Sequence, residues 1–385
     1  MKTTAILFAL LGSALLSAQE VQPAEAANRY LSVKHEARLA MSSGVDYLKS
    51  QQQDEGHWGK AELPAFTALA LTAALRDPGY DHSQETPEWI EKGFDYLRAK
   101  QQEDGGIYET GLATYNTSTS IMAFLALGKE EDESRILKAR AFLIGQQTDW
   151  GNKGETDDQF DGGIGYGGSY DHSDLSNTYM ALEAIYHSRE LAEDSANGNQ
   201  PKLNWDAALT FISRCQNLTE TNDLDYASDD ADNKGGFIYF PGQSKAGEQE
   251  IGDDRVALRS YGSMSYAGLL SLIYAELPKD DPRLVAVMDW LGRNFTLEEN
   301  PGMGLQGLYY YYQAIAKSLS AAGVEMLELE GDKTVDWRKE LATTILTKQR
   351  EDGSWANENS RWMENDPVLV TAYTVMALAQ LDAVM

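Results

Sequence analysis

A short repeated pattern constrains the fold of this chain more than any other feature. It places a glutamine four residues after an aliphatic residue, a glycine four residues after the glutamine, and a tryptophan two residues later. Residues 47–58 and 341–355 carry it almost completely, and residues 96–107 carry it with isoleucine in place of tryptophan. Six copies centre on Gln52, Gln101, Gln147, Gln216, Phe295 and Gln349, of which the fifth has lost its glutamine. The first three glutamines lie 49 and 46 residues apart, and a period near fifty residues indicates a repeated supersecondary unit.

Each copy predicts one helix, a glycine turn and a second helix. The second helices are rich in Ala, Leu, Tyr, Ser and Thr and carry few charges, so we expect them to be buried. They are expected at residues 64–76, 112–127, 174–188, 259–274, 305–322 and 367–381. The first helices, such as residues 92–100, are more amphipathic. Because no pair can bury its apolar face alone, the sequence predicts an all-α double ring, an (α/α)6 toroid of six helix-pair repeats with the function in its hole.

Charge limits the partners of the chain. Of its 385 residues, 42% are hydrophobic and 24% are charged, which supplies enough apolar material for a large core. The formal net charge of −28 would repel the phosphates of nucleic acid and of anionic lipid. We therefore expect a small-molecule partner and no nucleic acid.

The N-terminus has the pattern of a secretory signal. A charged start precedes an apolar run at residues 5–16 that is too short to span a bilayer. We expect residues 1–26 to be a signal peptide and short leader, cleaved after Ala18 or Ala26, and residues 27–385 to form a single ring. No later stretch reads as long and apolar enough to cross a membrane, so we expect no transmembrane segment and a secreted or periplasmic protein.

The repeated turns resemble those of the prenyltransferase and squalene-cyclase superfamily. Its signature is an aromatic–aliphatic pair, three residues, glutamine, a short spacer, glycine, one residue and tryptophan. The resemblance covers nearly the whole chain after the leader and implies a terpene cyclase-like α/α toroid. It also implies that Gln52, Gln101, Gln349, Trp58 and Trp355 are structural and tie each outer helix to the start of its inner helix. Function then depends on residues grafted onto the ring.

The acid motif of the triterpene cyclases in this superfamily is incomplete here. Those enzymes carry Asp-x-Asp-Asp-Thr at the start of an inner helix, and residues 174–178 match it only at Asp174 and Thr178. Ser176 and Asn177 stand at the acid positions, and neither side chain can deliver a proton to carbon. Asp174 also fits the role of a helix N-cap.

The zinc ligands of the protein prenyltransferases are missing as well. They include an Asp-x-Cys pair and a histidine, whereas Cys215 has Ser213 two residues before it and the five histidines show no paired spacing. We therefore expect no metal and no cofactor. The acidic stretches at residues 157–161 and 223–232 leave two alternatives open, a magnesium–diphosphate site and a calcium site.

The candidate working groups lie where inner helices begin. Arg259 and Tyr261 open the fourth inner helix, and Asp174 opens the third. Arg259 is expected to neutralise an anionic substrate group through bidentate hydrogen bonds, or alternatively to pair with Asp253 or Asp254. The expected cavity wall consists of Tyr115, Asn177, Tyr266, Tyr309, Tyr312 and Tyr373.

Three functions fit these features. The first is the binding or transformation of a polyisoprenoid in an aromatic central cavity. The second is a carbohydrate-active lyase or hydrolase that uses Arg259 and a tyrosine on a saccharide. The third is a non-catalytic binding or scaffold module. A cavity lined by Tyr, Phe and Leu favours the first, an open groove with arginine and carboxylates favours the second, and a closed centre favours the third.

Overall fold

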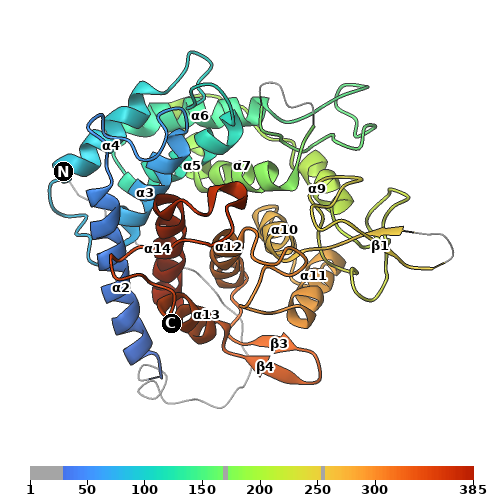
Figure 1. Cartoon of the computed structure of the whole chain (residues 1–385). Coiled ribbons are helices and arrows are strands. Elements are labelled where there is room, and N and C mark those ends of the chain that lie inside the picture. Colours follow the sequence, from blue (N-terminus) through green and yellow to red (C-terminus); the bar gives the residue numbers. More distant parts are fainter. Residues whose placement is uncertain (1–28, 168–171, 253–255) are drawn as a thin grey trace.

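The computed structural model describes residues 29–167, 172–252 and 256–385 (Figure 1). The expected signal peptide and leader at residues 1–26 lie outside the described residues, and so do Asp253 and Asp254.

Helices alternate along the chain as the repeat predicts. The expected inner helices are α3 (Pro64–Arg76), α5 (Ala113–Leu127), α7 (Leu175–His187), α10 (Gly262–Tyr274), α12 (Leu308–Ala321) and α14 (Pro367–Val384). The helices that precede them are α2 (Leu31–Ser50), α4 (Glu88–Ala99), α6 (Glu133–Gly145), α9 (Trp205–Arg214), α11 (Pro282–Arg293) and α13 (Trp337–Leu346). Every residue of α3 except Arg76 is buried, whereas α4 buries one face that includes Ile90, Phe94 and Leu97. The apolar and amphipathic compositions thus correspond to central and peripheral positions.

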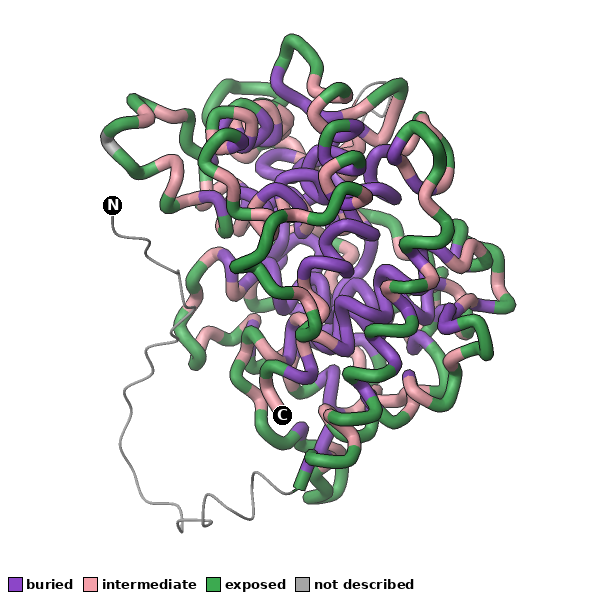
Figure 2. Tube along the Cα trace, turned by 90° about the vertical axis from the view of Figure 1, so that its left-hand side faces the viewer, coloured by how far each residue is buried: buried purple, intermediate pink, exposed green. Residues whose placement is uncertain are grey.

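The inner helices contact one another in chain order. Helix α3 packs on α5, α5 on α7, α7 on α10, α10 on α12 and α12 on α14, and α14 packs back on α3. The amphipathic helices lie against this series, for example α4 on α3, α6 on α5, α11 on α10 and α13 on α14. Figure 2 shows the buried segments gathered in the interior, with exposed turns and loops around them. The series of inner contacts therefore closes on itself.

Helix α14 corrects one expectation from the sequence. By length and composition alone it could cross a membrane, with a mean hydropathy of 1.4 over 18 residues. In the fold, 72% of this stretch is buried, because α14 packs against α2, α3 and α12. Its hydropathy is explained by this central position.

The glutamine of each intact copy makes the same pair of hydrogen bonds. Its Nε2 donates to the carbonyl oxygen of its own turn glycine and to a carbonyl oxygen at the next peripheral helix. The acceptor pairs are Gly56 and Trp89 for Gln52, Gly105 and Arg135 for Gln101, Gly162 and Asn204 for Gln147, Gly235 and Arg283 for Gln216, and Gly353 and Ala40 for Gln349. We call this pair of bonds the glutamine clamp. Because Ala40 lies in α2, the clamp of Gln349 joins the last helix pair to the first.

The clamp differs from the link that the family resemblance implies. The glutamine joins successive helix pairs, and a different group joins the turn to its own inner helix. That group is the backbone N–H two residues after the turn glycine, which donates to a hydroxyl of the inner helix. The donor and acceptor residues are Trp58 and Thr67, Ile107 and Thr117, Ile164 and Thr178, Phe237 and Ser265, and Trp355 and Thr371. The indole N–H of Trp58 and of Trp355 also donates back to its own peripheral helix, at Leu48 and Ile345.

The fifth helix pair is built differently, because Phe295 replaces the glutamine. A hairpin of β3 (Leu327–Leu329) and β4 (Lys333–Val335) packs on α11 at this joint. A second hairpin, β1 (Glu248–Glu250) paired with β2 (Val256–Leu258), leads into α10. These two antiparallel hairpins are the only sheets among the described residues.

Candidate functional site

A cavity of about 370 Å³ lies where the inner helices begin. All six inner helices contribute to its wall, and we call it the central cavity. Its aromatic lining consists of Phe66, Tyr115, Tyr166, Tyr239, Tyr261, Tyr310, Trp362 and Tyr373. The polar and charged lining consists of His172, Ser176, Asn177, Lys245, Ser263 and Glu364. The remaining side chains of the wall are apolar, so the cavity is a mainly aromatic space with a few polar groups.

The first amides of the inner helices are occupied by side chains of the protein. Five of these helices receive a side-chain acceptor at their N-terminus, which satisfies amides that have no partner within the helix. The acceptors are Asn116 for α3, Asp174 for α7, Asn300 for α10, Glu364 for α12 and Asp366 for α14. A ligand in the cavity would therefore bind mainly to side-chain groups, because most of the first backbone amides already have acceptors.

Four of the residues expected from the sequence line the central cavity: Tyr115, Asn177, Tyr261 and Tyr373. The hydroxyls of Tyr115 and Tyr373 lie 2.8 Å apart in a hydrogen bond. Burial raises the pKa of Tyr115 to about 12 and the pKa of Tyr373 well above its ordinary value, so both phenols stay neutral.

Asp174 lies behind the cavity wall as the N-cap of α7. Its carboxylate accepts from the backbone N–H of Asn177 at 2.9 Å and from the Asn177 side-chain amide at 2.8 Å. Burial is the largest cause that raises its pKa, to about 6. Within the described residues, this arrangement leaves the Asn177 Oδ1 buried without a hydrogen-bond partner, on a side chain that lines the cavity. Asp174 thus positions Asn177, which offers the ligand an acceptor.

Three of the expected tyrosines lie outside the cavity wall. The rings of Tyr309 and Tyr312 do share a face of α12 and meet at 5.6 Å, but the Tyr312 hydroxyl donates to the Leu297 carbonyl. Tyr266 packs against Tyr311 at 5.6 Å. Tyr310, which the sequence reasoning did not single out, is the ring of α12 that faces the cavity.

Arg259 is exposed and does not line the central cavity. It follows strand β2, where side chains alternate in direction, so that Leu258 and Ser260 are buried and Arg259 is not. Its backbone N–H donates to the Gly247 carbonyl and holds the end of this strand. The expectation that Arg259 reaches a ligand in the hole assumed a helical start at residue 259, but α10 begins at Gly262.

Glu364 is a cavity residue that the sequence reasoning missed. It is 1% exposed and accepts from the backbone N–H of Tyr310 at 2.8 Å and from the Asn357 side chain at 2.7 Å. Burial raises its pKa, and these hydrogen bonds lower it by a smaller amount. Its partner helix lies more than fifty residues earlier in the chain, so no local sequence pattern marks it.

The mouth of the central cavity carries exposed apolar side chains. Trp362 and Met363 line the cavity and are 41% and 39% exposed, and both have a left-handed backbone, with φ of 54° and 62°. The Lys245 ammonium stands over the Tyr239 ring at 4.4 Å, in the geometry of a cation–π contact. An apolar ligand would thus meet aromatic surface from the mouth inward.

The acidic stretches are used by the loops themselves. Asp161 accepts from the backbone N–H of Trp150 and of Asp158, and Asp223 pairs with Arg214 at 2.8 Å. Within the described residues, no group of three or more His, Cys, Asp or Glu has the geometry to hold a metal ion. Cys215 is fully buried at the end of α9.

Comparison with known proteins defines the class of this fold. The structure resembles that of a variant of the type II terpene cyclase MstE from Scytonema in complex with the substrate geranylgeranyl dihydroxybenzoate. The TM-score is 0.54 at 12% identity, over 92% of this chain and 99% of that chain. A complex of a MstE variant with the product merosterolic acid A gives a TM-score of 0.54 at 13% identity, over 92% of this chain and 99% of the other. The resemblance to the terpene cyclase-like superfamily is confirmed at the level of fold.

Sequence comparison adds one partial match. The lanosterol synthase erg7A of Aspergillus fumigatus is 32% identical over 79 residues, which are 20% of this chain. The match spans only 10% of the length of that synthase. No protein-family model matches the chain.

Proposed function

We propose that the protein binds a polyisoprenoid in the central cavity of an (α/α)6 toroid formed by residues 27–385. The observation that carries this proposal is the aromatic wall to which all six inner helices contribute. Its volume of about 370 Å³ falls within the roughly 300–1,000 Å³ typical of small-molecule sites. The faces of neutral aromatic rings suit an unsaturated hydrocarbon chain, and Asn177 offers a hydrogen-bond acceptor to a polar end group. The fold likeness to a terpene cyclase solved with its substrate supports the same ligand class.

We further propose that the pattern at residues 1–26 directs export of the chain to the periplasm or beyond. This rests on the charged start and short apolar run. N-terminal sequencing of protein recovered from a cell fraction outside the cytoplasm should begin after Ala18 or Ala26.

Binding is tested with two adjacent tyrosines of one helix. Tyr310→Ala removes a ring that faces the cavity, whereas Tyr309→Ala removes a buried ring that does not. We expect Tyr310→Ala to weaken geranylgeraniol binding by roughly tenfold or more, the loss expected for about 1.5–3 kcal/mol of buried aromatic contact. Tyr309→Ala should lower the melting temperature and leave the affinity unchanged.

Isothermal titration calorimetry measures both variants against the wild type. Equal losses of affinity in the two variants would contradict a site in the central cavity. Binding of an oligosaccharide in place of every polyprenol would favour the carbohydrate-active alternative, and binding of neither would favour the scaffold alternative.

Glu364 favours a second candidate function, acid-initiated cyclisation. Its buried carboxyl lines the cavity, and its raised pKa keeps a larger share of it protonated than in water. In such a reaction the carboxyl proton is transferred to an alkene carbon, whose π electrons form the new C–H bond. A tertiary carbocation and the Glu364 carboxylate result. The π electrons of a second alkene in the same chain then attack this cation, which forms the ring C–C bond and moves the positive charge to another carbon. The surrounding ring faces stabilise the cation until an adjacent carbon loses its proton to water, and the Glu364 carboxylate takes up a proton from solvent again.

Turnover is tested by incubating the protein with geranylgeraniol and analysing the extract by gas chromatography and mass spectrometry. We expect Glu364→Gln to bind the polyprenol but give no cyclised product. Wild-type activity should fall as the pH rises through the raised pKa of Glu364, because the acid must be protonated to react. If Asp174→Asn abolishes turnover while Glu364→Gln preserves it, the acid is Asp174 and the assignment of Glu364 is wrong.

A further inference from the structure

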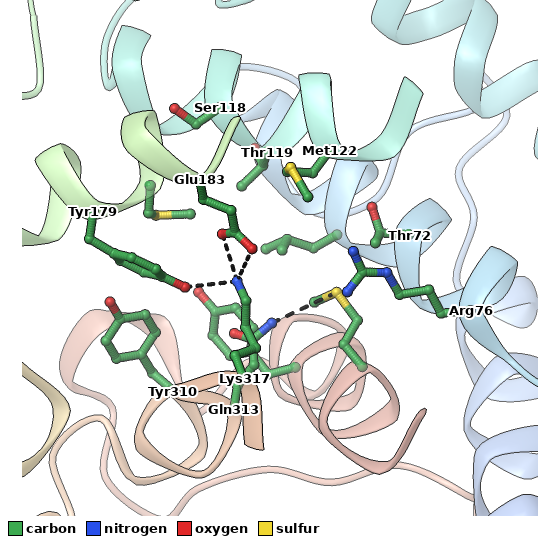
Figure 3. A pocket seen from close by; sticks show the side chains of 14 residues that line it. Thr72, Arg76, Ser118, Thr119, Met122, Tyr179, Glu183, Tyr310, Gln313 and Lys317 are labelled. Carbon is green, nitrogen blue, oxygen red and sulfur yellow. Dashed lines mark hydrogen bonds and ion pairs between the residues drawn. The ribbon is translucent and has the colours of Figure 1, made fainter. Parts of the chain in front are cut away.

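A second, smaller chamber lies further along the inner helices (Figure 3). Its volume is about 30 Å³, which is room for about two water molecules at 10–15 Å³ each. Residues in the later turns of the inner helices line it, and it shares Tyr310 and Tyr373 with the central cavity. We call it the inner chamber. The two spaces thus meet at these two rings.

Lys317 and Glu183 neutralise each other on one side of the inner chamber. The Lys317 ammonium lies 2.6 Å from the Glu183 carboxylate and 2.7 Å from the Tyr179 hydroxyl. The Lys317 cation holds the pKa of Glu183 below its ordinary value in spite of burial, so the acid stays ionised. The pair therefore contributes no net charge to the chamber.

Arg76 faces the same space from the last turn of α3. Figure 3 shows its guanidinium turned toward the centre of the chamber. Arg76 is partly exposed, and within the described residues its side chain has no hydrogen bond and no ion pair, although its charge acts on Glu183. This is unusual in a chain with 60 acidic and 32 basic residues, where carboxylates are plentiful as partners. The inner chamber consequently carries one positive charge in excess.

Ser118 is a second group without a partner. This residue lines the chamber from α5 and is 1% exposed, and its hydroxyl has no hydrogen-bond partner among the described residues. Figure 3 shows Ser118 across the chamber from Arg76. A buried hydroxyl is almost always hydrogen-bonded, so the unpaired state of Ser118 favours a chamber that holds another molecule.

We propose that the inner chamber binds one carboxylate group. Arg76 would hold both carboxylate oxygens in its planar fork. Two oxygen atoms match the space for about two waters, whereas a phosphate with four oxygens exceeds it. The carboxylate belongs either to a free small acid or to the end of an isoprenoid acid whose chain occupies the central cavity. The second source rests on the proposed function above, because the chain must pass Tyr310 and Tyr373.

Two arms of one experiment distinguish these sources. In the first, calorimetry compares geranylgeranoic acid with geranylgeraniol, which has the same chain without the carboxylate. In the second, thermal unfolding is followed with and without sodium acetate at constant ionic strength. Both arms use the wild type, Arg76→Gln, and Arg350→Gln as a control that removes an exposed arginine elsewhere.

For an isoprenoid acid, we expect the wild type to bind the acid roughly tenfold or more tightly than the alcohol, as expected for a charge-assisted bidentate pair. Arg76→Gln should lose this difference while its affinity for the alcohol is unchanged. For a free acid, acetate should raise the melting temperature of the wild type and Arg350→Gln but not of Arg76→Gln. This second result would stand even if no polyprenol binds.

The proposal is overturned if Arg76→Gln matches the wild type in both arms. If Arg76→Gln does not fold, Arg76→Lys replaces it, because lysine keeps the charge and loses the fork. It should then show a smaller preference for the acid, or a smaller acetate effect, than the wild type. An unchanged preference in the lysine variant would also overturn the proposal.

Discussion

Gly162→Ala should destabilise the protein by roughly 4 kcal/mol or more. Gly162 has a φ of +85°, and a Cβ added there would lie 1.9 Å from the Ala207 carbonyl oxygen. The neighbour is backbone and cannot rotate away. Left-handed backbone at a residue with a side chain costs about 1–3 kcal/mol, and overpacking of a tight contact adds about 1–3 or more. Because the Gly162 carbonyl accepts from Gln147, the shift that relieves the clash also breaks a glutamine clamp.

Gly154→Ala is the matched control for this variant. Gly154 has the same φ of +85°, but nothing lies within 4 Å of the position of an added Cβ. Gly154→Ala should cost only about 1–3 kcal/mol, the penalty for left-handed backbone alone. Urea unfolding followed by circular dichroism measures both variants. Equal losses of stability would mean that the close approach of the third turn to α9 is relaxed in solution.

Trp355→Ala should cost about 3–5 kcal/mol, the usual loss for a fully buried tryptophan. Trp355 is 0% exposed, its indole N–H donates to the Ile345 carbonyl at 2.9 Å, and its backbone N–H donates to the Thr371 hydroxyl. A Cβ added to Gly44 in α2 would lie 3.1 Å from its ring, which shows how closely the first helix packs on it. The cavity left by alanine therefore opens where the last helix pair meets the first.

Trp150→Ala is the comparison for Trp355→Ala, because Trp150 is 42% exposed in a loop. The loss of stability in Trp150→Ala should be well below that in Trp355→Ala. Ligand affinity should be unchanged in both variants, since neither tryptophan lines the central cavity. A Trp355→Ala protein with wild-type stability would contradict the structural role of this residue.

The helix pairs could be predicted from the sequence because the repeat is local. A glutamine, a glycine and a tryptophan within seven residues mark the first and last turns, weaker copies mark the others, and low charge marks the inner helices, so that each of the six expected inner segments contains a helix. The partner of the glutamine could not be predicted in the same way. Gln52 reaches Trp89, which is 37 residues away, and no pattern near either residue specifies that contact.

The candidate site was harder to predict from the sequence, because the direction in which a side chain points depends on where its helix begins. The three-residue difference at the start of α10 leaves Arg259 at the surface, whereas Tyr261 still lines the cavity. A usable signal was present in α12, where Lys317 is the one charged residue and Gln313 the one amide of a largely buried helix. Their helical spacing from Tyr310 places all three toward the centre. Glu364 and Arg76 carried no such signal.

Because the fifth helix pair lacks the glutamine, one joint between helix pairs is held differently from the other five. Five joints are held by the same two hydrogen bonds, while in the described residues the joint between the fifth and sixth pairs has the β3–β4 hairpin in place of that clamp. Local opening proceeds where the fewest bonds must break, and it does not require global unfolding. We therefore expect local opening at this joint, between α11 and α13, to leave the clamps of the other five joints intact.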